Sequence, residues 1–372
     1  MKDFHNNLDE QILYHPEQPS KTYCRYMLGL QEISPAEKNI ADKMTGTYRK
    51  ESGTFKCQVA MCKGTGCQAS GEIPLKTKFD QIIKEKGLEK DIHIIETGCR
   101  GFCEMGPIIE IFPQKIFYVR VTPDHVEDII NKTILNGEII DELVFQNSPY
   151  ADEIGFYKKQ TRRVLGESGV IDAENINDAV AAGSYLGLKR CLFEMNPAEV
   201  VDEVKKAGLR GRGGGGFLTG IKWQLTAKQD EPVKYVVCNA DEGDPGAFMD
   251  RSLLEGDPHK VIEGMAIAAY AVGAQEGYVY VRAEYPLAIQ RLKEAIAQAL
   301  EVGFLGENIM GKGFNFTLKI AQGAGAFVCG EESALIASIE GKRGMPTPKP
   351  PFPAERGLFD KPTNINNVET YG

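Results

Sequence analysis

Four cysteines in two short pairs carry the clearest chemical signal in this 372-residue sequence. Cys62 and Cys67 are separated by Lys-Gly-Thr-Gly, and Cys99 and Cys103 are separated by Arg-Gly-Phe. Where two such pairs meet, four thiolates converge on one metal centre. The glycines let backbone amides face anionic sulfur, which favours and tunes an iron–sulfur cluster. We therefore predict a [2Fe–2S] cluster, with tetrahedral zinc and no metal as the open alternatives.

The elements expected around these pairs bring the two cysteine loops together. Residues 54–61 and 91–96 are predicted strands, and residues 75–86 form an amphipathic helix between them. Such a crossover makes the strands parallel neighbours, so both loops emerge at the same edge of the sheet. Cys57 lies five residues before Cys62 within the first strand and faces the opposite side, which excludes it as a ligand.

A glycine-rich loop at residues 208–223 is the second signal. Six of the nine residues from 208 to 216 are glycine, and residues 211–216 fit the pattern G-x-G-x-x-G. The loop follows a predicted helix rather than a strand, so the setting of a Rossmann dinucleotide turn is missing. Dense glycine favours close approach of a ligand to exposed amides, and Lys222 adds the positive charge that a phosphate needs. A flexible linker is the alternative, which Phe217 argues against.

Two acidic loops follow predicted strands at residues 234–238 and 314–320. The sequence NADEGDPG comes after the first strand and GAGAFVCGEE after the second. Ligands of open α/β sheets bind outside the carboxyl ends of strands, so these loops are expected to face the glycine-rich loop. Their carboxylates suit ribose hydroxyls, a carboxamide or flavin ring N–H groups rather than phosphate. For Glu331 and Glu332, a turn that only caps the next helix is the alternative.

Charge and hydropathy narrow the classes of function. The 43 basic and 52 acidic residues leave a formal net charge of −9, which disfavours binding to nucleic acid or to anionic membranes. The longest apolar run, residues 265–274, is too short for a membrane span, and the N-terminus lacks the apolar core of a signal peptide. An odd number of cysteines, nine, fits a reducing compartment, so we expect a cytoplasmic protein without direct membrane insertion.

The expected elements divide the chain into four segments and predict an α/β fold class. Residues 1–52 are a polar extension with a short helix at 36–44, and residues 53–145 form a small thioredoxin-like β-α-β-β-α domain. Residues 146–195 are a connector with helical stretches. Residues 196–372 form an α/β domain in which strands and helices alternate.

Five ordered motifs then resemble one family. They are GLRGRGGGGFLTGIKW at 208–223, NADEGDPGAFMDR at 239–251, GAGAFVCGEE at 323–332, KPPFP at 349–353 and PTNINNVET at 362–370. Together they resemble the NADH-binding flavoprotein subunit of complex I and its relatives in NAD-linked hydrogenases and formate dehydrogenases. The cysteine segment resembles the thioredoxin-like [2Fe–2S] ferredoxins. Their fusion in this order resembles the NADH-linked subunit of electron-bifurcating [FeFe]-hydrogenases.

The resemblance implies cofactors and residues that contact them. Flavin contacts of FMN are expected from Gly211, Gly213, Lys222, Asn239, Asp241, Glu242, Phe327, Glu331, Asn366 and Asn367. Contacts with NAD(H) are expected from Phe217, Asp244, Glu332, Lys349 and Phe352. Arg212 and Gly216 complete the predicted cofactor-binding set, and Glu242 and Glu332 are the expected catalytic residues. The cluster ligands are Cys62, Cys67, Cys99 and Cys103.

Departures from the family pattern bear on affinity and on the missing cluster. Leu218 replaces a proline, Gly215 an alanine and Leu225 a stacking phenylalanine, so weaker nucleotide affinity is expected. The family continues into a ubiquitin-like domain and a helical bundle with a [4Fe–4S] cluster, whereas this sequence ends at Gly372. No C-x-x-C-x-x-C spacing is present, so no [4Fe–4S] cluster is expected here, and the sequence is a fragment or the remainder lies on another polypeptide.

The resemblance also implies a reaction and partners. Hydride passes between NAD(H) and FMN, and single electrons continue to iron–sulfur clusters of a multisubunit, hydrogenase-type oxidoreductase. The expected partners are an iron–sulfur catalytic subunit and a small [2Fe–2S] subunit. A complex I-like NADH dehydrogenase, an NAD-linked formate dehydrogenase and a non-catalytic electron carrier are the alternatives.

Overall fold

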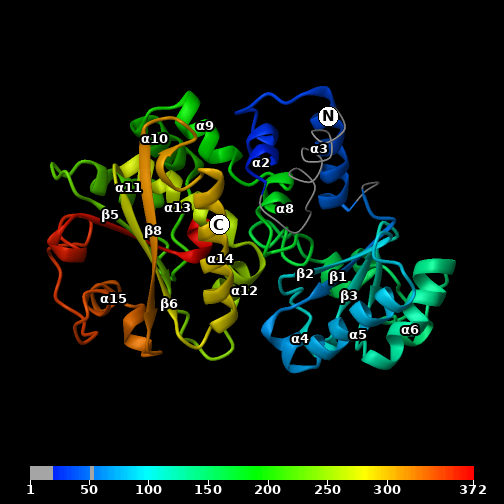
Figure 1. Ribbon diagram of the computed structural model, residues 1–372. Helices are drawn as coiled ribbons and strands as arrows, with labels where there is room; N and C mark the ends of the chain where they lie inside the picture. Colours follow the sequence, from blue (N-terminus) through cyan, green and yellow to red (C-terminus); the bar gives the residue numbers. More distant parts are fainter. Residues whose placement is uncertain (1–19, 51–53) are drawn as a thin grey trace. The chain divides into compact units, whose positions relative to one another are not determined.

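The computed structural model describes residues 20–50 and 54–372, which fall into two compact units. One unit consists mainly of residues 32–182 and the other mainly of residues 183–372. In Figure 1 the colours run along the sequence from blue at the N-terminus to red at the C-terminus, so the residues of each unit can be identified by colour. Residues 1–19 and 51–52 of the predicted N-terminal extension lie outside the described residues. The short helix expected in this extension is present as α3 (Pro35–Tyr48), which is longer than predicted. A capping box formed by Ser34 and Glu37 stabilises its first turn.

The first unit contains a four-stranded sheet in the order β2-β1-β3-β4. Its strands are β1 (Cys57–Cys62), β2 (Ile92–Thr97), β3 (Ile109–Phe112) and β4 (Ile116–Tyr118). Strands β1 and β2 are parallel, whereas β3 pairs antiparallel with both β1 and β4. The crossover helix is α5 (Glu72–Glu85), preceded by α4 (Thr65–Ala69). The predicted β-α-β-β order and the parallel pairing are therefore confirmed.

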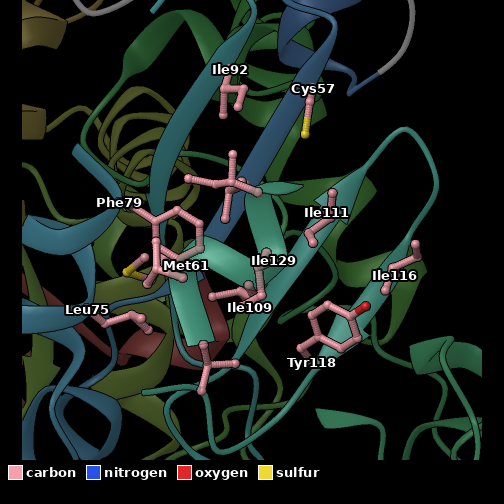
Figure 2. Packing of buried hydrophobic residues seen from close by; sticks show 14 of the residues in the cluster. Cys57, Met61, Leu75, Phe79, Ile92, Ile109, Ile111, Ile116, Tyr118 and Ile129 are labelled. Carbon is pink, nitrogen blue, oxygen red and sulfur yellow. The ribbon is translucent and has the colours of Figure 1, made fainter. Parts of the chain in front are cut away.

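The core of this unit follows the alternation of side chains along β1. Cys57, Val59 and Met61 lie in one buried cluster with Leu75 and Phe79 of α5. Figure 2 labels Cys57, Met61, Leu75 and Phe79 in this cluster. Cys62, one residue further along, belongs to a different cluster. The closing helix expected at 124–135 is instead a short 3₁₀ turn, one α-helical turn α6 (Val126–Asp128) and a π-helix at Ile129–Leu135. Its apolar face still packs into the same core.

The second unit contains a five-stranded sheet in the order β7-β8-β6-β5-β9. Its strands are β5 (Tyr235–Ala240), β6 (Glu276–Arg282), β7 (Gly306–Ile309), β8 (Phe314–Gly323) and β9 (Thr363–Asn367). Only β7 is antiparallel to its neighbour. The chain runs from β5 outward to β6 and β8, and then returns to place β9 on the other side of β5. The strand order therefore reverses between β5 and β9, where doubly wound sheets bind ligands.

Helices precede, connect and follow the strands of the second unit. They are α9 (Leu186–Glu194), α10 (Pro197–Ala207), α11 (Thr219–Ala227), α12 (Met249–Gly256), α13 (Pro258–Val272), α14 (Pro286–Val302), α15 (Glu332–Ile339) and α16 (Val368–Tyr371). The predicted strands and helices of this unit are present within a few residues, while β7 and β9 were not predicted. Helices α7 (Gly155–Lys158) and α8 (Ile176–Ala181) lie in the first unit. No helix of the described ranges has the length and apolar character needed to cross a membrane.

Candidate functional site

The four predicted cluster cysteines lie at one edge of the first sheet. Cys62 is the last residue of β1 and pairs in register with Thr97, the last residue of β2. Cys67 lies in α4, directly after β1, and Cys99 and Cys103 follow β2. The Sγ atoms of Cys99 and Cys103 are 3.8 Å apart. The parallel strands thus deliver both cysteine loops to the same place, as the sequence predicts.

The sulfur atoms are close enough to perturb one another. Hydrogen bonds from the Cys62 thiol to Cys67 and Cys99, together with burial, raise the pKa of Cys62 well above its usual value. The hydrogen bond from Cys62 lowers the pKa of Cys67, which burial opposes. Thiolates so close to one another repel, so full ionisation requires a cationic centre among them.

Glycines pack directly against these sulfurs. A Cβ atom at Gly64 would lie 2.9 Å from Cys99 Cβ, one at Gly66 would lie 3.1 Å from Cys103 Sγ, and one at Gly106 would lie 2.9 Å from Cys67 Sγ. The amide of Gly101 also donates a hydrogen bond to Cys99 Sγ, at 3.2 Å. Exposed amides and the absence of side chains let the backbone surround an anionic cluster, so the residues present fit a [2Fe–2S] group.

The sulfur geometry alone does not separate iron from zinc. Two thiolates on one tetrahedral metal, at about 2.3 Å each, lie about 3.8 Å apart for either metal. Among the residues that the structure describes, no group of three or more His, Cys, Asp or Glu side chains is arranged to hold a metal ion. The ligand roles of the four cysteines therefore stay predictions. Cys57 lies in the apolar core, where burial raises its pKa to about 12.

The glycine-rich loop borders a cavity of about 480 Å³ in the second unit. The loop connects α10 to the N-terminus of α11, a position that favours anions. The carboxyl ends of β5 and β9 and the start of α15 complete the wall. The lining residues are Gly211, Gly213, Gly215, Gly216, Phe217, Thr219, Lys222, Asn239, Gly330, Glu331, Glu332, Lys349, Ile365, Asn366, Asn367 and Thr370.

A second cavity of about 650 Å³ shares residues of both loops and both strands with the first. It is lined by Arg212, Gly213, Gly214, Asn239, Asp241, Glu242, Gly243, Asp244, Ala247, Met249, Asp250, Phe327, Val328, Gly330, Glu331, Asn367 and Glu369. Every predicted cofactor-binding residue lines one of these cavities except Phe352. The Phe352 ring is 53% exposed and lines neither cavity. Its predicted contact with NAD(H) stays a prediction.

Hydrogen bonds join the loops around these cavities. Asn239 Nδ2 donates to the carbonyl of Gly330 at 2.9 Å, which links the two acidic loops. The amide of Arg212 donates to Thr370 Oγ1 at 2.9 Å, which ties the glycine-rich loop to α16. Lys222 Nζ donates to the carbonyl of Ile365 at 2.6 Å, and burial lowers the pKa of this lysine. Lys222 is thus a fixed, partly buried cation in the wall of the first cavity.

Two buried oxygen atoms in the cavity walls have no hydrogen-bond partner among the described residues. They are Thr219 Oγ1 in the first cavity and Asp241 Oδ2 in the second. Buried polar atoms are rarely left without a partner, so each suits a polar ligand atom. Cofactor sites commonly have volumes of about 300 to 1,000 Å³, which each cavity matches. The chemistry and size of the lining therefore fit a nucleotide cofactor such as FMN.

The acidic residues have structural contacts as well. Glu331 Oε2 accepts hydrogen bonds from the amides of Ser333 and Ala334, so it caps α15 as the alternative prediction states. Its Oε1 accepts from Lys349 Nζ at 2.9 Å, and Lys349 also donates to Glu332. Glu331 therefore both lines the first cavity and caps α15. Glu332 accepts a hydrogen bond from Lys349 but does not cap the helix.

Glu242 also has a structural contact. Its two carboxylate oxygens accept hydrogen bonds from the amides of Asp250 and Arg251, each at 3.2 Å, in the first turn of α12. The hydroxyl of Tyr285 donates to the same side chain at 3.2 Å. A cavity-lining carboxylate here is thus fixed by a helix N-terminus, and its predicted catalytic role stays a prediction.

Several lining residues escaped the sequence reasoning. Thr219, Ile365 and Thr370 line the first cavity, and Asp250 lines the second. All four stand within the quoted motifs at 208–223, 239–251 and 362–370, which is the signal that would have found them.

Comparisons with known proteins assign each unit to a domain family. Residues 204–372 match the model of the Nuo51 FMN-binding domain, and residues 46–134 match the thioredoxin-like [2Fe–2S] ferredoxin. The NADP-reducing hydrogenase subunit HndC of Solidesulfovibrio fructosivorans is 61% identical over 214 residues, which are 58% of this chain and 43% of that protein. An NADH-quinone oxidoreductase subunit of Rhizobium meliloti is 53% identical over 207 residues, 56% of this chain and 49% of that protein.

A third relative extends across both units. The NAD-reducing hydrogenase HoxS subunit alpha of Cupriavidus necator is 36% identical over 345 residues, which are 92% of this chain and 55% of that protein. The chain spans about half the length of the curated relatives it matches.

Proposed function

The chain carries a thioredoxin-like [2Fe–2S] ferredoxin domain followed by a Nuo51 FMN-binding domain, and from this we propose that it is an NADH dehydrogenase-type oxidoreductase subunit. It would pass hydride between NAD(H) and FMN and relay single electrons to iron–sulfur clusters. The observation that carries the proposal is the meeting of the glycine-rich loop, both acidic loops and the end of β9 around two adjoining cavities. This meeting lies where the strand order of the sheet reverses.

The first cavity supplies groups for an anionic cofactor. Amides of the loop at Gly211, Gly213 and Gly216, with the ammonium of Lys222, would hold the phosphate of FMN. Asn366 and Asn367 at the end of β9 offer amide groups, and Asp241 offers an oxygen without a partner, for the ring and ribityl chain. Bound FMN supplies chemistry that no side chain has, since it accepts two electrons with hydride and releases them one at a time.

An exposed aromatic ring at the rim of the first cavity suits the second nucleotide. Phe217 is 54% exposed and lines this cavity, whereas Phe327, which is 69% exposed and lines the second cavity, is a predicted flavin contact. Apolar rings held at the mouth of a polar cavity offer stacking surfaces for nicotinamide and adenine. Glu332 and Asp244 would accept hydrogen bonds from hydroxyl or carboxamide groups of NAD(H). These side chains orient the two ring systems, and orientation is the main contribution of the protein to hydride transfer.

The proposal extends to partners and location. Of the four predicted cluster ligands, Cys103 alone is not fully buried, so electrons would leave the cluster on the side of the Cys99–Cys103 loop. The expected acceptors are an iron–sulfur catalytic subunit and a small [2Fe–2S] subunit of one hydrogenase-type complex. All nine cysteines lie in the described residues and none of them forms a disulfide there, which suits the reducing cytoplasm where NAD(H) is available.

One spectroscopic experiment tests the proposal. The protein is purified without oxygen and reconstituted with FMN, iron and sulfide, and spectra are recorded before and after NADH. We expect a flavin band that NADH bleaches, a visible cluster absorption, and NADH-dependent reduction of a viologen dye. A non-catalytic carrier would keep the cluster spectrum but show no dye reduction after reconstitution. A colourless protein that holds zinc would contradict the cluster.

A further inference from the structure

A buried ion pair lies beside the predicted cluster, and we propose that it sets the reduction potential of the cluster. The pair consists of Arg100, which raises the potential, and Glu110, which lowers it. Both are positioning residues that act through their charges and not as ligands. The inference rests on the proposed function, because it requires a [2Fe–2S] cluster at the four cysteines.

The two charges are enclosed next to the ligand loops. Arg100 follows Cys99 directly and is 8% exposed, and Glu110 on β3 is 6% exposed. Arg100 Nη2 donates a hydrogen bond to Glu110 Oε2. Glu110 is opposite Ala60 of β1, two residues before Cys62. The pair therefore links the Cys99–Cys103 loop to β3, and β3 is the neighbour of the strand β1 that ends at Cys62.

Neighbouring residues hold the arginine in place. Gly169 has a φ of +87°, and a Cβ atom there would lie only 2.3 Å from Arg100 Cδ, so only glycine allows this approach. The Tyr157 hydroxyl donates to the Arg100 carbonyl at 3.2 Å, and the guanidinium lies 5.8 Å from the centre of the Phe117 ring. A buried ion pair commonly contributes no more stability than an apolar pair of similar size. A buried ion pair beside a redox centre therefore points to an electrostatic role rather than to a gain in stability.

Arg100 directly follows the predicted ligand Cys99, and its partner Glu110 is opposite Ala60 on the strand that ends at Cys62. The buried charges of the pair therefore lie next to the predicted ligand loops. Charges act over longer distances where water is excluded. Reduction adds an electron to an already anionic cluster, so a fixed cation nearby favours the reduced form and a fixed anion disfavours it.

The experiment is an EPR-monitored redox titration of the full chain with its cluster and FMN. We expect Arg100→Met to shift the midpoint potential to more negative values and Glu110→Gln to shift it to more positive values. The double variant Arg100→Met/Glu110→Met removes both charges and is expected to return near the wild-type potential. Opposite shifts from the two halves of one pair are the signature, because a purely structural role does not predict opposite signs.

Matched controls remove the same charges from an exposed pair of the same unit. Lys132 and Asp128 form a pair with side chains about half exposed, so Lys132→Met and Asp128→Asn should leave the potential unchanged because water screens them. If the midpoint potential shifts in the same direction in Arg100→Met and Glu110→Gln, or shifts in neither variant, this inference is overturned while the proposed function stands. If Arg100→Met loses the cluster, the sign of the shift in Glu110→Gln decides. A wild-type protein with no signal from a reduced cluster would overturn the proposed function as well.

Discussion

Glu331 caps α15 with its side chain, whereas Glu332, the first residue of that helix, does not. Lys349 donates a hydrogen bond to each of the two carboxylates. Replacement of Glu332 should therefore affect ligand binding without weakening α15. We expect Glu332→Ala to raise the KM for NADH about tenfold, a loss of about 1.4 kcal/mol, while FMN content stays constant. Steady-state dye reduction and flavin quantification measure the two effects.

The control for this residue is Glu307→Ala, which removes an exposed carboxylate of β7 away from both cavities. It should change neither quantity. Equal losses of FMN and of NADH affinity in Glu332→Ala would contradict the division of roles between the two nucleotides.

Asp250 gives the second cavity a dependence on pH. Burial, with the charge of Glu242 nearby, raises its pKa from 3.8 to about 7, although Asn367 Nδ2 donates to its carboxylate at 2.6 Å. Because the folded-state pKa lies above the unfolded value, the stability contributed by the protonated group is complete below about pH 4. It is lost as the pH rises to 7.

Asp250→Asn should therefore stabilise the protein relative to wild type more at pH 8 than at pH 5, and the difference between the two pH values should be up to about 3 kcal/mol. Denaturant unfolding at both pH values measures the difference. Asp230→Asn, at an exposed site, is the matched control and should show the same effect at both. A pH-independent difference for Asp250→Asn would show that this carboxyl is ionised throughout.

At the scale of elements, helix α12 depends on a carboxylate from the loop before it. Glu242 accepts hydrogen bonds from two amides of the first turn, those of Asp250 and Arg251. We expect Glu242→Ala to lower the free energy of unfolding by about 1–2 kcal/mol even without cofactors, which is the usual loss for a helix cap. Thermal unfolding of the apoprotein measures it, with the exposed Glu301→Ala on α14 as the control. If the stability of the apoprotein is unchanged by Glu242→Ala, the capping role is contradicted and only the role in ligand binding remains for Glu242.

The two cysteine loops form a second dependent pair of elements. A methyl group at Gly64 would lie 2.9 Å from Cys99 Cβ, so Gly64→Ala must push the loop after β1 away from the loop after β2. We expect this variant to lose most of its bound iron and cluster absorbance. Gly155→Ala is the matched control, since a Cβ atom there meets nothing within 4 Å. Iron content measured after identical reconstitution compares the two, and equal content would contradict the predicted ligand set.

Elements with strong periodicity were predictable, and those defined by long-range pairing were not. The helix α14 has apolar residues on one face, and β5 is a short buried run, so both were found within a few residues. In contrast, β9 has the polar sequence TNINN and is a strand because it pairs with β5. The same limit applies to the site. The cofactor-binding residues predicted from the motifs line the cavities, with the exception of Phe352, whereas the capping bonds of Glu242 follow only from the folded position of α12.

At the scale of the whole molecule, the two candidate centres lie in separate compact units. The four cysteines belong to the first unit, and the residues that line both cavities belong to the second. Each centre is therefore built by its own core, and the loss of one should not abolish the other. We expect Cys62→Ser to lose the cluster signal while FMN content and NADH-dependent viologen reduction stay within twofold of wild type.

Cys57→Ser is the matched control, because Cys57 is a buried thiol on the same strand that faces the apolar core rather than the predicted cluster. It should keep the cluster, although the buried hydroxyl lowers stability. EPR of the reduced protein and flavin quantification separate the two outcomes. Loss of FMN in Cys62→Ser, with FMN kept in Cys57→Ser, would mean that the flavin site requires an intact cluster. Each centre would then no longer be the product of its own unit.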